Sequence, residues 1–225
     1  MKKIVVGITM VTLFCLPSML LAAGIGGLFG KKEAPKVNVD GLTSRSTAVM
    51  SLVQKASVYF AESVVAIHEA VGNKEKAERL KQNMADFKSK PGQQTQKTLM
   101  TNVGTDLSEI EKNETIAQIN AEEAQKFMGQ AVLGVGVGIL LDGLAVQNAG
   151  PLLNEAQGAL KQAPITSAGK INEVIDVGQF VTQEVPPQIS TVKTFSGRLI
   201  DYAKAKGIAL PSAEDTNKKY ELEKN

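Results

Sequence analysis

Tryptophan is absent from this sequence of 225 residues, and histidine and cysteine occur once each. One histidine and one cysteine are too few for the usual zinc and copper sites, and a di-iron bundle needs two Glu-x-x-His motifs. The histidine, His68, follows Ile67 at the edge of an apolar helical stripe, so we interpret it as a surface or stripe-edge residue and not as a catalytic base. No Cys-x-x-Cys-His motif for haem attachment is present. We therefore expect no metal ion and no cofactor.

Carboxylates close in sequence are the remaining candidates for acid–base chemistry. These pairs are Glu109 and Glu111, Glu122 and Glu123, and Glu214 and Asp215. Adjacent residues on a helix do not face each other, and all three pairs stand in lysine-containing stretches suited to solvent. A phosphate loop is also excluded, because Lys32 follows Lys31 where Ser or Thr is required. We expect a protein that is not an enzyme, and an enzyme working without histidine or metal is only a third hypothesis.

The chain also lacks an excess of one charge and is poor in aromatic residues. Lysine and arginine number 25, aspartate and glutamate number 23, and the aromatic content is 4%. Without a basic stripe the chain lacks the phosphate-neutralising charge of nucleic-acid binders, so no nucleic acid is expected as a partner. Burial must rely on Val, Leu, Ile and Ala, with Gln, Lys and Glu as further helix formers. This composition favours an all-α bundle.

The N-terminus has the layout of a secretory signal peptide. Lys2 and Lys3 precede an apolar run over 4–16, and Pro17 and the small residues 22–24 follow it. An uncleaved anchor is long enough to span a membrane, but the proline and the small residues favour cleavage near residue 23. We therefore predict a signal peptide over 1–23.

Cleavage there determines the composition of the mature chain. The single cysteine, Cys15, leaves with the signal peptide, and Phe14 before it argues against a lipoprotein. Lys2 and Lys3 leave as well, so 23 basic and 23 acidic residues remain. No disulfide can then stabilise the fold, which depends on packing alone. The short basic start is typical of bacterial export, so we expect the periplasm or the cell surface.

Apolar residues recur at helical spacing over 41–207, after a flexible Gly, Lys and Pro leader over 24–40. The helices predicted first cover residues 42–71, the stretch from Asn73 to Pro91, residues 99–110 and a segment that starts near Glu114. Further along, Pro151 and Pro164 bracket a short helix, and two more helices meet at Pro186-Pro187 and end at Gly207. Residues 208–225 are polar, and we predict a frayed tail. The expected fold is a multi-helix bundle of about five to seven helices.

One segment, residues 127–146, is unusual because ten of its twenty residues are Phe, Val, Leu or Ile and five are Gly. In a helix these glycines forgo about 4–5 kcal/mol of intrinsic preference relative to alanine, so close packing must offset them. Gly134 and Gly138 are four positions apart, a spacing that lets two helix backbones approach closely, and Gly136 lies on another face.

Three interpretations of this segment stay open. It is a Gly-rich apolar helix buried in the middle of the bundle, a membrane-inserting helix, or a glycine-rich strand with a hairpin turn at Asp142-Gly143. The candidate residues for helix packing or membrane contact are Phe127, Gly134, Gly136, Gly138, Leu141 and Asp142.

The leading hypothesis is an exported, non-enzymatic helical accessory protein of the bacterial cell envelope that binds a protein partner or associates with itself. The rival is a pore-former type of protein that inserts residues 127–146 into a membrane.

Overall fold

The structure is a computed structural model that describes residues 37–112 and 121–224. The predicted signal peptide and most of the predicted leader lie outside the described residues. The described residues form six helices and no strand. The helices are α1 (Val39–Ala70), α2 (Lys74–Ser89), α3 (Gln93–Lys112), α4 (Ala121–Leu160), α5 (Ile165–Ala205) and α6 (Ala213–Glu223). The predicted all-α multi-helix bundle is confirmed.

Caps and breakers set the ends of the first helices. The side chain of Asn38 accepts a hydrogen bond from the backbone N–H of Gly41 (2.9 Å), so α1 begins at Val39, inside the segment predicted as leader. Gly72 has a φ of 74°, which only glycine adopts without strain, and it ends the α1 region. Asn73 caps α2 through the N–H of Lys76 (3.3 Å). These breaks lie where the sequence predicted them.

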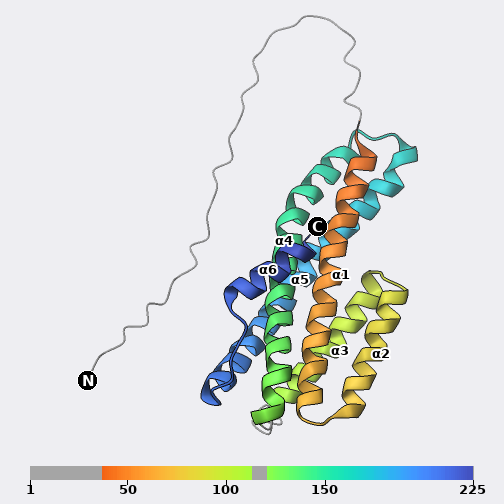
Figure 1. The fold of residues 1–225 in the computed structure, drawn as a ribbon. Coiled ribbons are helices and arrows are strands. Elements are labelled where there is room, and N and C mark those ends of the chain that lie inside the picture. The colour runs from red at the N-terminus through yellow and green to blue at the C-terminus, as the bar shows by residue number, and fades with distance from the viewer. Residues whose placement is uncertain (1–36, 113–120, 225) are drawn as a thin grey trace, which may run out of the picture. The chain divides into compact units, whose positions relative to one another are not determined.

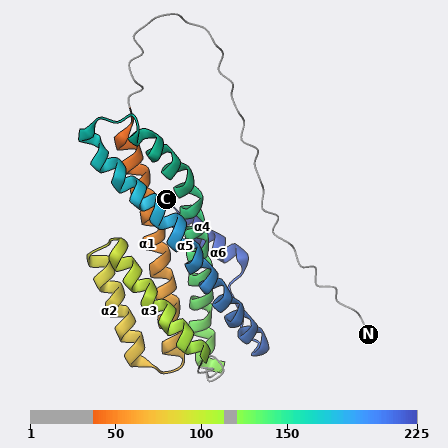
Figure 2. The same ribbon diagram turned by 180° about the vertical axis from the view of Figure 1, so that it is seen from behind.

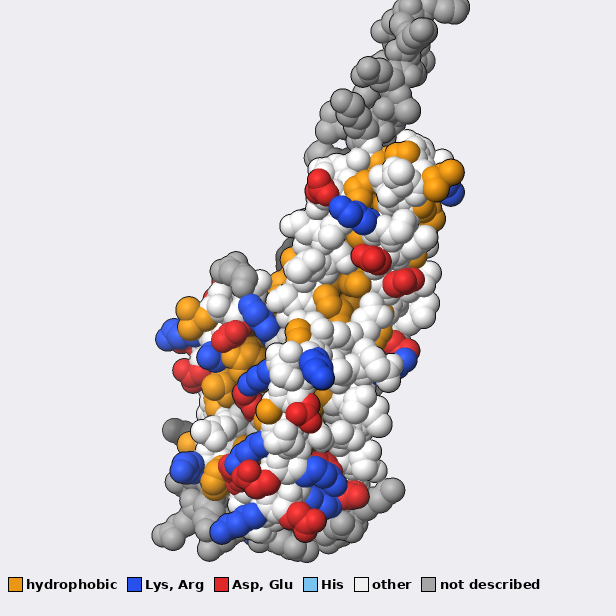
Figure 3. All heavy atoms as spheres, turned by 90° about the vertical axis from the view of Figure 1, so that its right-hand side faces the viewer, with side chains coloured by type: hydrophobic (Ala, Val, Ile, Leu, Met, Phe, Trp, Pro, Cys, Tyr) orange, Lys and Arg blue, Asp and Glu red, His pale blue; other side chains and the backbone are white. Residues whose placement is uncertain are grey.

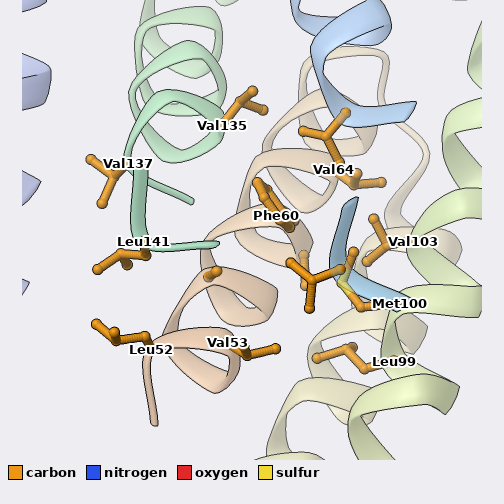
Figure 4. Close-up of a cluster of buried hydrophobic side chains, with 14 of the residues drawn as sticks. Leu52, Val53, Phe60, Val64, Leu99, Met100, Val103, Val135, Val137 and Leu141 are labelled. Atoms are coloured by element: carbon orange, nitrogen blue, oxygen red, sulfur yellow. The ribbon is translucent and has the colours of Figure 1, made fainter. Parts of the chain in front are cut away.

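Three long helices make the centre of the bundle (Figures 1 and 2). α4 packs chiefly against α1 and α5, while the hairpin of α2 and α3 packs on α1. The core residues of α1, α3 and α4 meet in one apolar cluster (Figure 4). The cluster includes Leu52, Val53, Phe60, Val64, Leu99, Met100, Val103, Val135, Val137 and Leu141. The long apolar helix therefore runs through the middle of the fold.

Of the proline breaks predicted in the second half, the one at Pro164 is confirmed, because Pro164 directly precedes α5, and those at Pro151 and Pro186-Pro187 are wrong. Pro151 lies inside α4, and Pro186 and Pro187 lie inside α5. All three proline side chains are exposed, whereas the buried stripe of α5 continues through Val185 and Val192. A proline inside a helix costs about 3 kcal/mol. Here that cost is offset by packing along the opposite side of each helix, which local sequence does not reveal.

The predicted frayed tail is wrong for residues 213–223, which form α6. Ser212 caps this helix, because its hydroxyl accepts a hydrogen bond from the N–H of Asp215 (3.1 Å) and the Asp215 carboxylate accepts one from the N–H of Ser212 (2.9 Å). This reciprocal capping box is a known helix-start signal. The Ser-x-x-Asp spacing would have predicted α6 from the sequence.

Candidate functional site

Residues 127–146 are helical throughout and form the central part of α4. The strand and hairpin interpretation is therefore wrong. Alternation of glycine and valine over 134–138 has the period of a strand, but in α4 it divides the glycines between two helix faces. Each face receives a different neighbouring helix.

Gly134 and Gly138 lie on the face that packs against α1. A β-carbon added at Gly134 would overlap the Ser63 hydroxyl, and one added at Gly138 would overlap the ring of Phe60. Both glycines are buried, and Phe60 is 1% exposed. The four-residue spacing thus permits the close approach of α1 and α4.

Gly136 lies on a different face, where it contacts α6. A β-carbon at this position would lie 2.8 Å from the methyl carbon of Thr216 and 3.8 Å from its Cβ. Figure 1 shows α6 lying across α4. The sequence separated Gly136 from the other two glycines, but it did not indicate which element would cover it.

Leu141 and Asp142 are both buried in the bundle, and Phe127 is partly buried at its edge. Leu141 lies near Leu52 of α1 in Figure 4. The Asp142 carboxyl is 1% exposed, and neither of its oxygens has a hydrogen-bond partner among the described residues. Burial raises the pKa of this carboxyl well above its ordinary value, because the charged form is poorly solvated there.

The outward surface of α4 is uncharged, and it combines partly buried aliphatic side chains with exposed glycine and amide residues. Six aliphatic side chains of the 127–146 segment are only partly buried, namely Val132, Leu133, Ile139, Leu140, Leu144 and Val146. Between Lys126 and Glu155, Asp142 is the sole ionisable residue, and it faces inward. Within the described chain, α4 over Lys126–Leu160 is the one helix long and apolar enough to cross a membrane, and less than half of its most apolar window is buried. Core helices of soluble proteins meet the same criterion, so this property alone does not identify a membrane span.

Charged side chains gather elsewhere. Figure 3 shows one face of the molecule on which residues of both signs cover the region of α2 and α3, whereas the opposite end of that face carries few. The charged surface of α2 and α3 is suited to contact with water. The uncharged surface of α4 is suited to contact with another helix.

α6 is fastened to α1 by polar contacts at its C-terminal end. Lys55 Nζ donates to the backbone carbonyl of Glu223 (2.6 Å), and the Tyr59 hydroxyl donates to the Glu223 carboxylate (2.9 Å). Lys219 Nζ lies 3.3 Å from that carboxylate and 5.9 Å from the centroid of the Tyr59 ring. The hydrogen bond from Tyr59 lowers the pKa of Glu223 despite its partial burial, because the bond stabilises the charged form.

The rest of α6 is loosely covered. None of its residues is buried, and Leu222 on its outer face is 77% exposed. Thr216 and Tyr220 are partly buried on its inner side. α6 is thus a polar helix docked on an apolar one.

A groove runs along α1 beside this contact. It consists of two hollows of about 390 and 380 Å³ that share Tyr59 and Glu62 in their walls. Phe87 and Met84 of α2 contribute apolar wall on one side, and Leu133 of α4 contributes it on the other. The C-terminal residue of α6, Glu223, closes one end.

A buried polar cluster joins α1, α2 and α3, and the apolar stripes of the sequence did not indicate it. His68 is 2% exposed, so its assignment to a surface or stripe edge is wrong. Its Nε2 lies 3.5 Å from Oδ2 of the fully buried Asp106, whose other oxygen accepts a hydrogen bond from Arg79. Burial acts to raise the pKa of Asp106, but His68 and Arg79 together hold it below its ordinary value.

The position of Asp106 within an apolar stripe was the signal that could have revealed this cluster. It lies three residues after Val103 and directly before Leu107, both of which are buried. A carboxylate on a buried helix face requires a partner, and the histidine and arginine supply it. The cluster fastens the α2 and α3 hairpin to α1.

Neither the polar contacts at Glu223 nor the cluster of His68, Asp106 and Arg79 has the composition of a metal centre. Among the residues that the structure describes, no three His, Cys, Asp or Glu side chains are grouped so that they could hold a metal ion. Comparisons with protein-family models, curated proteins and solved structures find no match to this chain. The functional interpretation therefore rests on the contacts of α4 and α6.

Proposed function

We propose that this protein is an exported, non-enzymatic helical accessory protein of the bacterial cell envelope that works by binding a protein partner or by associating with itself. Export is supported by the basic start, the apolar run and the small residues at the N-terminus. Action by contact is supported by one observation above all, the docking of the polar helix α6 on the uncharged outer face of α4. Depletion of charge together with partly buried aliphatic side chains, as on this face, is typical of the core of interaction sites.

The experiment for this proposal follows the native protein in a bacterium that carries its gene. We expect the envelope fraction to contain a processed chain that begins near residue 24 and migrates in gel filtration as a complex larger than one chain. The N-terminus is determined by mass spectrometry and the mass of the complex by light scattering. An unprocessed chain confined to the cytosol, or a processed chain that is a monomer at every concentration, would contradict the proposal.

A second candidate function is insertion of α4 into a membrane. The observation that favours it is the absence of ionisable residues other than Asp142 between Lys126 and Glu155. At a rise of 1.5 Å per residue this stretch exceeds the roughly 30 Å of a bilayer core. Asp142 is also buried in the bundle, so the outward surface of this stretch carries no charge.

Dye release from liposomes tests this second function. Val137 is buried, so a charge there would unfold the bundle and prove nothing about membranes. Gly143 is exposed, and a side chain there meets no neighbour within 4 Å. Insertion of α4 predicts that Gly143→Asp abolishes dye release whereas Gly143→Ala preserves it. Equal release by both variants, or intact liposomes with the unaltered chain, would exclude this function.

A further inference from the structure

The connection between α4 and α5 forms an apolar point of the bundle. Figures 1 and 2 show this connection at one end of the bundle, beside the start of α1. Ile165, the first residue of α5, is 94% exposed, and Pro164 before it is exposed as well. Among the described residues, Leu222 of α6 is the other exposed large hydrophobic side chain. We call residues 160–170 the α4–α5 tip.

The α4–α5 tip is held in place on its inner side. Leu160 and Ala163 pack against the core, and the side chain of Ile171, directly after the tip, is fully buried. These contacts fix the chain on both sides of Ile165. The Ile165 side chain therefore stays in solvent while the bundle is folded.

The charge of the α4–α5 tip is positive. Lys161 and Lys170 are its two ionisable residues, and both are exposed. Lys170 Nζ lies 3.9 Å from the carboxylate of Asp40, an exposed pair of little energetic weight, whereas Lys161 makes no ion pair with a described residue. The neighbouring Arg45 and Glu155 neutralise each other at 2.6 Å. The apolar point is therefore flanked by an unpaired ammonium group, which complements a negative surface.

The shape of the α4–α5 tip favours a lipid surface over a protein surface. A stable protein interface buries about 800 Å² on each partner, whereas the tip projects one large apolar side chain. A bilayer interface needs no matching hollow, because lipids rearrange around a side chain that enters them. Lysines beside such a side chain lay their apolar stems along the interface and place their ammonium groups among anionic headgroups.

We propose that the α4–α5 tip docks the folded bundle on an anionic lipid surface, with Ile165 in the bilayer interface and Lys161 and Lys170 at the headgroups. The contact is reversible, because one isoleucine and two lysines supply less apolar area than a single acyl anchor, which by itself binds only marginally. This site is separate from the outer face of α4 and goes beyond the proposed function, since α4 stays within the bundle.

A single tryptophan tests this docking, because the chain has none of its own. Ile165→Trp places the fluorophore on the α4–α5 tip, and Leu222→Trp on α6 is the matched control. Both side chains are exposed, so neither substitution disturbs the core. Each full-length variant is mixed with phosphatidylglycerol vesicles. We expect the emission from position 165 to move to shorter wavelengths and to be quenched by brominated lipid, while the emission from position 222 stays as in water.

The lysines are tested in the Ile165→Trp variant. Adding Lys161→Gln should raise the lipid concentration at the half-maximal shift about fivefold, because the attraction of one lysine to the anionic surface is lost. Vesicles of uncharged phosphatidylcholine should raise it by roughly tenfold or more, since the attraction of both lysines is then lost. Equal half-maximal concentrations on the two kinds of vesicle would overturn the role of the lysines.

Two results would overturn docking by the α4–α5 tip. One is an emission from position 165 that does not change with lipid, or that changes no more than the emission from position 222. The other is dye release from the same vesicles that Gly143→Asp abolishes together with the shift at position 165, which would assign the membrane contact to insertion of α4. Docking by the tip predicts vesicles that keep their dye. Complex formation in gel filtration does not involve the tip, so the proposed function stands or fails separately.

Discussion

Gly136 of α4 faces Thr216 of α6 so closely that a β-carbon on the glycine would lie 2.8 Å from the threonine methyl. This relationship links the unusual glycine-rich segment to α6, which lies in the region predicted as a frayed tail. It also explains why Gly136 stands on a face different from that of Gly134 and Gly138, which pack on α1. The glycines of α4 serve two separate helix contacts.

The first prediction concerns the contact between α1 and α4. Gly138→Ala places a methyl group against the buried ring of Phe60, and overpacking of this kind costs about 1–3 kcal/mol. Gly143→Ala meets no neighbour and gains the helix preference of alanine, up to about 1 kcal/mol. Urea unfolding should therefore show opposite signs for the two substitutions. Stabilisation by both would mean that α1 and α4 are not in close contact at Gly138.

The second prediction concerns Asp142. The folded state holds the proton of this carboxyl to a higher pH than the unfolded chain does, so the unfolded chain binds fewer protons above its own pKa. The free energy of unfolding should then fall by about 1.4 kcal/mol for each pH unit between the unfolded and the folded pKa, and level off above the folded one. Asp142→Asn should remove this decline. Urea unfolding from pH 4 to pH 8 measures it, and equal slopes for the two proteins would contradict the burial of an unpartnered acid.

The third prediction concerns Asp106, whose effect on stability has the opposite sign. Its pKa is lowered in the fold, so its contribution is present above the unfolded pKa and is lost as the pH falls through the folded one. Asp106→Ala leaves buried His68 without its partner and should cost about 1–3 kcal/mol near pH 7. Arg79 is half exposed, so Arg79→Ala should cost no more than about 1 kcal/mol. Equal costs for the two substitutions would show that the cluster is solvated.

The fourth prediction concerns the attachment of α6. Tyr59→Phe removes the hydrogen bond to Glu223, which is worth about 0.5–1.5 kcal/mol, and keeps the ring. The backbone amides of residues 213–223 should then exchange with deuterium about two- to tenfold faster, while those of α5 keep their rates as the internal control. Unchanged exchange in α6 would mean that Tyr59 does not hold this helix.

Periodicity sufficed to predict most of the fold. Local spacing left residues 127–146 open between a buried helix, a membrane helix and a strand, whereas the stripe of α1 and the break at Gly72 and Asn73 follow from local spacing and from turn residues. The continuity of α5 through Pro186 and Pro187 does not, since packing on the far side of the helix offsets the missing hydrogen bonds. The residues next to the two prolines do not indicate that this packing exists.

Only the features of the candidate site that lie close together in the sequence were predictable. The spacing of the α4 glycines indicated close helix contacts, but the partners Phe60 and Thr216 are distant in sequence. Burial of His68 depended in the same way on Asp106, which a different helix supplies. Contacts between helices that are distant in sequence form only in the packed fold. A single sequence indicates that a residue needs a partner but not which residue supplies it.

The proposed function requires the outer face of α4 to contact a protein. The most direct test places a photo-crosslinking amino acid at Gly143, which is exposed on this helix, in cells that express the chain. The same amino acid at Lys161, exposed after the end of α4, is the control. We expect a discrete adduct from position 143, with a second copy or with an envelope protein, that is absent from position 161. Identical adduct patterns from the two positions, or none from either, would contradict it.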